Sequence, residues 1–181
     1  SLEPASRVAV VLSGNGVYDG NDTTEAVATL VHLSRFGCKV SCFAPDKEQM
    51  HAVDHTSGAE HEATRNVLQE SARITRGAIS PLSDLPQKVA DFDAVVFPGG
   101  FGVAKNLSSW ATEGTACTVD DDVAAVIKSF HAANKPQGAC CIAPVLFAKC
   151  IPGAKVTVGS SRTDDPLWPH AGTAGEITEL G

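Results

Sequence analysis

The stretch Lys135-Pro-Gln-Gly-Ala-Cys-Cys-Ile-Ala-Pro144 predicts a short buried strand that turns sharply into a helix. Pro136 suits the first residue of a strand, and Gly138 lets neighbouring backbones approach closely. Pro144 suits the first turn of a helix, where its missing N–H costs nothing. Two cysteines therefore lie where a strand, a tight turn and a helix follow one another.

Cys141 is the predicted nucleophile of this turn. Adjacent residues of a strand face opposite ways, so we expect Cys140 to finish the strand and Cys141 to occupy the turn. Unpaired backbone N–H groups and the positive end of the helix dipole would both stabilise a thiolate there. The alternative is that both cysteines are small apolar core residues, as free cysteines usually are.

Strands and helices are expected to alternate along the chain. Apolar runs predict strands at Arg7–Leu12 (the central strand), Lys39–Ala44, Asp93–Phe97 and Lys155–Val158, in addition to the strand at Gln137. Helices are predicted from an N-cap within Asn21–Glu25 to a stop at Gly37, around Glu62–Arg76, and over Asp120–Ala133. This alternation indicates an α/β fold with a parallel sheet covered on both sides.

Glycine-rich segments follow two of these strands. Ser13–Gly20 comes after the first strand, and Pro98–Gly102 comes after the Asp93–Phe97 strand. Because ligands of parallel sheets bind at the carboxyl ends of the strands, these segments and the cysteine turn are expected to converge on one pocket.

Composition restricts the classes of function. The chain has 181 residues, 43% of them hydrophobic, and a formal net charge of −7, with its fourteen basic residues scattered singly. We therefore expect one globular domain and no nucleic-acid partner. No apolar run approaches the roughly 20 residues that span a bilayer, so no membrane segment is expected. The six cysteines lie in strand- and helix-like segments of a chain long enough to form a full-size core, which favours a reducing compartment over a disulfide framework.

Several segments resemble a known family. They are Leu12-Ser-Gly-Asn-Gly-Val-Tyr-Asp-Gly20, Arg65-Asn-Val-Leu68, Phe97-Pro-Gly-Gly-Phe-Gly102 with Ala104-Lys-Asn-Leu107, and Cys141-Ile-Ala-Pro144. Together they resemble the ElbB-like branch of the ThiJ/PfpI, or class I glutamine amidotransferase-like, superfamily. The resemblance implies a flavodoxin-like sandwich with a cysteine nucleophile elbow at Cys141. It also implies a single domain over residues 1–181 that lacks the C-terminal strand and helix of its relatives.

The resemblance further implies an acidic partner at Glu25 and oxyanion-binding N–H groups in the Gly99-Gly100 turn and at Ile142. Asn15 stands where the branch usually has a cysteine, and it is a further candidate for substrate binding. A carboxyl group beside a thiolate is driven by burial and like-charge repulsion to keep its proton, so Glu25 would act as a proton shuttle. Glu25 as a helix first-turn acid, and the two glycines as a simple tight turn, remain the alternatives.

The function implied by the resemblance is that of a cofactor-independent thiol enzyme acting on small reactive carbonyls. It would convert glyoxal to glycolate, or remove related carbonyl adducts from amines, without a metal or cofactor. No His-x-Glu or His-x-Asp pair occurs in the chain, which disfavours a glutaminase. Animal members of the branch imply a mitochondrial location, with a bacterial cytoplasm as the alternative. A homodimer is also compatible with the resemblance, with Trp110 or Trp168 either in its interface or in the core.

Three other interpretations remain open. A polar segment contains His51, Asp54, His55 and His61, which raises the possibility of a metal site. Gly14-x-Gly16 with Asp46 at the end of the second strand would suit a dinucleotide, although the third glycine is misplaced and Asp19 would repel phosphate. Lastly, Cys141 would equally serve a non-catalytic redox-sensing or protein-stabilising domain.

Overall fold

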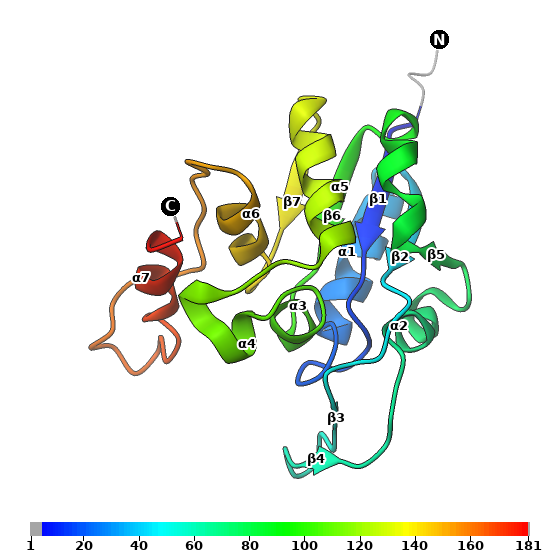
Figure 1. The fold of residues 1–181 in the computed structure, drawn as a ribbon. Coiled ribbons are helices and arrows are strands. Elements are labelled where there is room, and N and C mark those ends of the chain that lie inside the picture. The colour runs from blue at the N-terminus through cyan, green and yellow to red at the C-terminus, as the bar shows by residue number, and fades with distance from the viewer. Residues whose placement is uncertain (1–4, 181) are drawn as a thin grey trace.

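A five-stranded parallel sheet forms the centre of the fold (Figure 1). The computed structural model describes residues 5–180. The strands lie in the order β5-β2-β1-β6-β7, with bounds β1 (Arg7–Val11), β2 (Lys39–Ala44), β5 (Ile79–Pro81), β6 (Ala94–Phe97) and β7 (Gln137–Ala139). The first strand is central, as the sequence predicts. The α/β flavodoxin-like architecture is thereby confirmed.

Both faces of the sheet are buried, which explains the continuous apolar run of the first strand. Ala9 and Val11 belong to the core cluster on one face, whereas Val10 and Leu12 belong to the cluster on the other. All four side chains are fully buried. Since successive side chains of a strand point to opposite faces, a strand covered on both sides has no polar positions.

Two helices cover one face of the sheet, and the remaining helices gather on the other (Figure 1). The first face is covered by α1 (Thr23–Arg35) and α2 (Val67–Thr75). The second set comprises η1 (Leu82–Asp84), η2 (Pro86–Asp91), α3 (Phe101–Lys105), α4 (Trp110–Glu113), η3 (Gly114–Ala116), α5 (Asp121–Ala132), α6 (Pro144–Cys150) and α7 (Thr173–Thr178). Of the helices between residues 5 and 180, none is both long and apolar enough to cross a membrane.

The helix α5 shows how periodicity fixes the packing. Val123, Val126, Ile127 and Phe130 recur at helical spacing and are fully buried against the sheet. Burying each such side chain stabilises the fold by about 1.5–3 kcal/mol. The predicted helix over Asp120–Ala133 is therefore confirmed, with the carboxylate of Asp120 as its N-cap.

The helix α1 begins where the cap residues predict. The side chain of Asp22 accepts hydrogen bonds from the N–H groups of Thr24 and Glu25, at 2.8 and 3.1 Å. The helix ends at Arg35, and Gly37 follows with a φ of 72°. The cap places Glu25 in the first turn of α1, at the carboxyl end of the sheet.

Two predicted elements differ from the structure. The helix expected around Glu62–Arg76 is shorter, because Asn66 caps it at one end and Arg76 leaves it in the left-handed conformation at the other. The strand predicted at Lys155–Val158 is wrong. Val156 and Val158 do pack against the core, and exposure alternates along the segment, but within residues 5–180 it pairs with no strand of the sheet.

A small antiparallel hairpin lies beyond the carboxyl ends of the strands, at the bottom of Figure 1. It consists of β3 (Ala52–Val53) and β4 (Glu60–His61). The sequence of its first strand predicts a polar loop instead, because two-residue strands carry no periodic signal. Its position brings the hairpin against the loop that follows β1.

Candidate functional site

Three loops that lie far apart in the sequence meet at the carboxyl end of the sheet. They follow β1, β6 and β7, the strands expected to contribute them. The backbone N–H of Asp22 in the first loop donates to the carbonyl of Gly99 in the second at 3.0 Å. A side chain on Gly99 would collide with Cβ of Cys141 in the third loop. The glycine-rich segments and the cysteine turn thus form one site.

The cysteine turn is a sharp elbow between β7 and α6. The N–H of Cys140 donates to the carbonyl of Phe97 at 3.2 Å, so Cys140 continues the pairing of β7 with β6. Cys141 then adopts a φ of 56°, in the left-handed region. This conformation costs a residue other than glycine about 1–2 kcal/mol. The strained turn leaves Cys141 exposed, whereas Cys140 is half-buried.

The thiol of Cys140 is poorly suited to react. Burial raises its pKa, and the charges of Glu25 and Cys141 raise it further, while a backbone hydrogen bond involving Gly99 opposes them. Its sulfur lies 3.9 Å from the carbonyl oxygen of Phe97, to which the thiol can donate. Cys140 is therefore held as a thiol beside its exposed neighbour.

Glu25 lies against both the cysteine turn and the glycine turn. Its Oε2 accepts a hydrogen bond from the N–H of Gly99 at 3.0 Å. Burial raises the pKa of Glu25, and the charge of Asp22 adds to this, while hydrogen bonds from Gly99 and from the Cys141 side chain oppose it. Because of the net rise, the Glu25 carboxyl keeps its proton to a higher pH than a carboxyl in water does. That proton is then available to the adjacent sulfur.

The candidate oxyanion donors differ in their availability. Glu25 already occupies the N–H of Gly99. Across the described part of the chain, the N–H groups of Gly100 and Ile142 donate to no protein acceptor. These two groups, from the glycine turn and the cysteine turn, are therefore free to bind an oxyanion. Asn15 lies elsewhere, in a neighbouring cavity, where its Oδ1 accepts a hydrogen bond from the hydroxyl of Thr23 at 2.7 Å.

Asn21 is a buried residue of the site that the sequence pattern does not single out. Its amide nitrogen donates to the carbonyl oxygens of Pro98 and Gly99, at 3.1 and 2.9 Å, and its Oδ1 accepts from the N–H of Ser13 at 2.7 Å. One side chain thereby fastens the loop after β1 to the glycine turn. The available signal was an amide residue directly after a glycine-rich loop and before a helix cap.

Backbone packing explains the glycines of these two loops. A Cβ on Gly100, whose φ is 106°, would lie 2.5 Å from the carbonyl oxygen of Gly20, and one on Gly102 would lie 2.5 Å from the Cα of Gly20. Neither position has room for any side chain. The close approach lets the first turn of α1 lie against the glycine turn.

The histidines of the hairpin make separate contacts. Between residues 5 and 180, no three His, Cys, Asp or Glu side chains gather as a metal-binding set. His51 lies between Glu60, at 3.0 Å, and the ammonium group of Lys105, at 2.8 Å. Burial lowers the pKa of Lys105, against the charges of Asp19 and Glu60. These contacts tie the hairpin to α3.

The acids of the first two loops do not suit a dinucleotide. Asp19 is buried, and its Oδ2 accepts a hydrogen bond from the N–H of Val53 at 2.7 Å. The carboxylate of Asp22 occupies the N-terminus of α1, where a pyrophosphate would otherwise bind. Asp46, the candidate ribose ligand, accepts a hydrogen bond from Asn66 at 2.8 Å.

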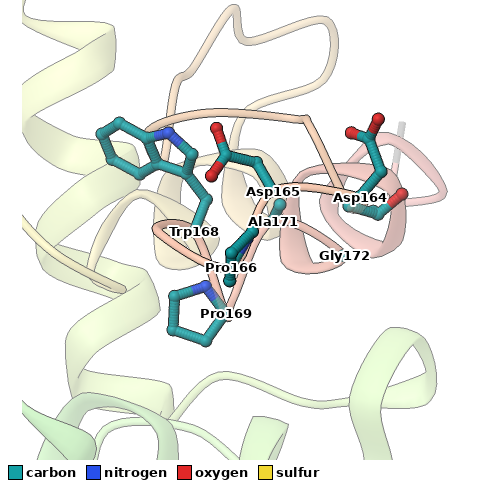
Figure 2. A pocket seen from close by; sticks show the side chains of 8 residues that line it. Asp164, Asp165, Pro166, Trp168, Pro169, Ala171 and Gly172 are labelled. Atoms are coloured by element: carbon teal, nitrogen blue, oxygen red, sulfur yellow. The ribbon is translucent and has the colours of Figure 1, made fainter.

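A second cavity lies at the C-terminal segment and is shown in Figure 2. It has a volume of about 490 Å³ and is lined only by residues of the segment 163–172, among them Asp164, Asp165 and Trp168. The lining contains no nucleophile or base comparable to the cysteine turn. Trp168 is 44% exposed, whereas Trp110 is buried in the core, so only Trp168 is available to an interface.

Comparison with known proteins finds a matching family and several similar relatives. The sequence profile of the DJ-1/PfpI family matches residues 7–173. The human "Glutamine amidotransferase-like class 1 domain-containing protein 3, mitochondrial" is 56% identical over 179 residues, covering 98% of this chain. The zebrafish (Danio rerio) "ES1 protein, mitochondrial" is 41% identical over 182 residues, covering 97% of this chain. The chain spans 66% of the human relative and 67% of the zebrafish one.

A solved structure shares the fold. It is an isoprenoid biosynthesis protein with an amidotransferase-like domain from Ehrlichia chaffeensis, with a TM-score of 0.84 and 36% sequence identity. The alignment covers 98% of this chain and 76% of that chain.

Proposed function

Because the chain belongs to the DJ-1/PfpI family, we propose that it is a cofactor-independent thiol enzyme that converts small reactive carbonyls, with glyoxal as the representative substrate. The single observation that carries this proposal is the exposed, left-handed Cys141 beside the carboxyl group of Glu25. The names of the relatives give no such activity, and the proposal rests on the chemistry of this pair.

The first step is addition of the Cys141 thiolate to an aldehyde carbon of glyoxal. The carbon–sulfur bond forms, the carbonyl π bond breaks, and its electron pair becomes the oxyanion of a hemithioacetal. The free N–H groups of Gly100 and Ile142 are suited to stabilise this charge. Glu25 shares the thiol proton and can return it to the oxygen.

The second step moves a proton between the two carbons. Glu25 removes the proton from the carbon that bears sulfur and delivers it to the neighbouring carbon through an enediol, which leaves a hydroxyacetyl thioester on Cys141. Water then attacks the thioester, releasing glycolate and the thiol. The sum is glyoxal plus water giving glycolate, so no external oxidant or reductant is needed. Removal of a carbonyl adduct from an amine is the related reaction at the same pair.

The experiment compares glyoxal conversion to glycolate, without metal or glutathione, by the wild type and three variants. We expect Cys141→Ala to abolish turnover, Glu25→Gln to lower kcat at least 100-fold, as for loss of a general acid–base group, and Cys140→Ala to remain active. Cys140→Ala is the matched control, since it removes the adjacent thiol. No turnover by any protein, together with rapid alkylation of Cys141, would instead indicate a redox-sensing domain.

A mitochondrial location and a homodimer belong to the same proposal. The human and zebrafish relatives are both named as mitochondrial, in agreement with the location that the sequence resemblance implies. A cytoplasmic location is the alternative, and subcellular fractionation separates the two. Sedimentation of the wild type and of Trp168→Ala tests the dimer and its interface.

A further inference from the structure

A cavity of about 500 Å³ lies between the loop after β1 and the hairpin. Asn15 and Thr23 line it from the loop, and Asp54, His61 and Arg65 line it from the hairpin and the segment that follows. The proposed reaction uses none of these side chains. The cavity is nevertheless close to the reaction site in the chain, because Thr23 and Glu25 share the first turn of α1.

Three side chains offer hydrogen-bond donors to this cavity. The hydroxyl of Thr23 donates to Oδ1 of Asn15, which fixes the orientation of the Asn15 amide. The Nδ2 group of Asn15 donates to no acceptor in the part of the protein that the structure describes. Nδ1 of His61 accepts from the N–H of Ala63 at 3.1 Å, so the proton of the neutral ring is on Nε2. Arg65 supplies the third group, a guanidinium.

The positive charge of the Arg65 guanidinium is only partly neutralised by neighbouring acids. Its nearest acid is Glu70, at 3.4 Å, but the same oxygen of Glu70 lies 3.0 Å from Arg73. One carboxylate is therefore shared by two arginines, and the three side chains of Arg65, Glu70 and Arg73 together keep a net charge of +1. Arg65 also has four further N–H donors in a planar fork, which suits two oxygens of one anion.

The acceptors of the cavity are already satisfied. Asp54 accepts from the N–H and the hydroxyl of Thr56, at 2.8 and 2.7 Å, and from the hydroxyl of Ser57 at 3.1 Å. Those hydrogen bonds lower the pKa of Asp54. His55 contacts the carbonyl oxygen of Val53 through Nδ1 and accepts from a backbone N–H through Nε2. A ligand of this cavity must therefore supply acceptors.

We propose that the cavity between Asn15, His61 and Arg65 binds an anionic oxygen group, a carboxylate or a phosphate. An anion would accept from the amide and the imidazole while neutralising the guanidinium. The carboxylate of Asp54, which also lines the cavity, opposes an anion, but it is exposed and water screens its charge. If the thiol enzyme proposed above is correct, its preferred carbonyl substrate carries such a group. The anion site itself does not depend on turnover.

The test is a titration of the wild type with inorganic phosphate and, separately, with acetate, following by NMR the side-chain amide signal of Asn15 and the backbone amide signal of Gly16, which also lines the cavity and is present in every variant. We expect saturable shifts with at least one anion. Arg65→Gln should weaken binding at least tenfold, and Asn15→Asp, which keeps the shape of the side chain but replaces its donor with a charge, should abolish it. Arg35→Gln removes the same charge from the exposed end of α1 and should change the affinity less than twofold.

Tighter binding of phosphate would indicate a phosphorylated ligand, and tighter binding of acetate would indicate a carboxylate. The proposal is overturned if neither anion shifts the Asn15 amide, or if Arg65→Gln and Arg35→Gln bind alike. Glyoxal is absent from this titration, so an inactive enzyme that binds the anion would refute only the proposed reaction.

Discussion

The left-handed conformation of Cys141 makes a prediction that reverses the usual ranking of alanine and glycine. At φ 56°, alanine keeps the strain of the turn and glycine does not. Glycine at position 141 relieves a strain of about 1–2 kcal/mol. The greater backbone entropy of glycine in the unfolded chain offsets about 0.5–1 kcal/mol of this gain. We therefore expect Cys141→Gly to be about 0.5–1 kcal/mol more stable than Cys141→Ala, although neither variant has the thiol.

The adjacent cysteine provides the matched control. Cys140 does not have a positive φ, so Cys140→Gly should be about 0.5–1 kcal/mol less stable than Cys140→Ala. Urea unfolding of the four variants measures both differences. The two glycine-minus-alanine differences should have opposite signs, and together they should span about 1–2 kcal/mol, or several degrees in Tm for a chain of this size. If glycine is no better than alanine at position 141, the elbow does not hold this strain.

Two further predictions concern Glu25 and Asn21. The pKa of Glu25 is raised above 4.5 in the folded protein, chiefly by burial, so the folded state binds this proton more tightly than the unfolded state does. Stability contributed by the group is present below pH 4.5 and is lost as the pH rises through the raised pKa. Urea midpoints at several pH values should therefore show the wild type losing stability relative to Glu25→Gln over this window, and a constant difference would contradict the shift. Asn21→Ala leaves the buried N–H of Ser13 without an acceptor and the carbonyl of Pro98 without its donor, and it removes one of the two donors to the carbonyl of Gly99. It should therefore lower the free energy of unfolding by about 2–3 kcal/mol, measured the same way; a loss below about 0.5 kcal/mol would show that the amide does not fasten the loops.

Strong local signals made much of the fold predictable. The uninterrupted apolar run of β1 indicates a strand covered on both faces, and its central place in the sheet follows. The N-cap candidates within Asn21–Glu25 include the observed cap, Asp22, and the spacing of the apolar residues in α5 sets the limits of that helix within a residue or two. The turn at Cys141 was predictable because Gly138 and Pro144 limit where the strand and the helix can lie.

Other features depend on contacts that no local pattern encodes. Exposure does alternate along Lys155–Val158, where the two valines are the less exposed residues. A strand also needs a partner strand, however, and periodicity does not say whether one is present. The three residues of β5 include a proline, which normally argues against a strand. The position of Asn21 after a glycine-rich loop does not predict its partners either, since the two carbonyls that it binds come from a loop 77 and 78 residues away.

The interlocked glycines also bear on how the protein folds. The hydrogen bond between Gly99 and Glu25 joins residues 74 positions apart, and Gly100 and Gly102 contact the backbone of Gly20 without an intervening side chain. Contacts at such separations carry a large loop-closure entropy and form late relative to local turns and helices. The thiol and its carboxyl partner can therefore meet only when β1, β6 and β7 have already paired. Recovery of Cys141 reactivity during refolding would then follow completion of the whole sheet, rather than formation of the cysteine turn alone.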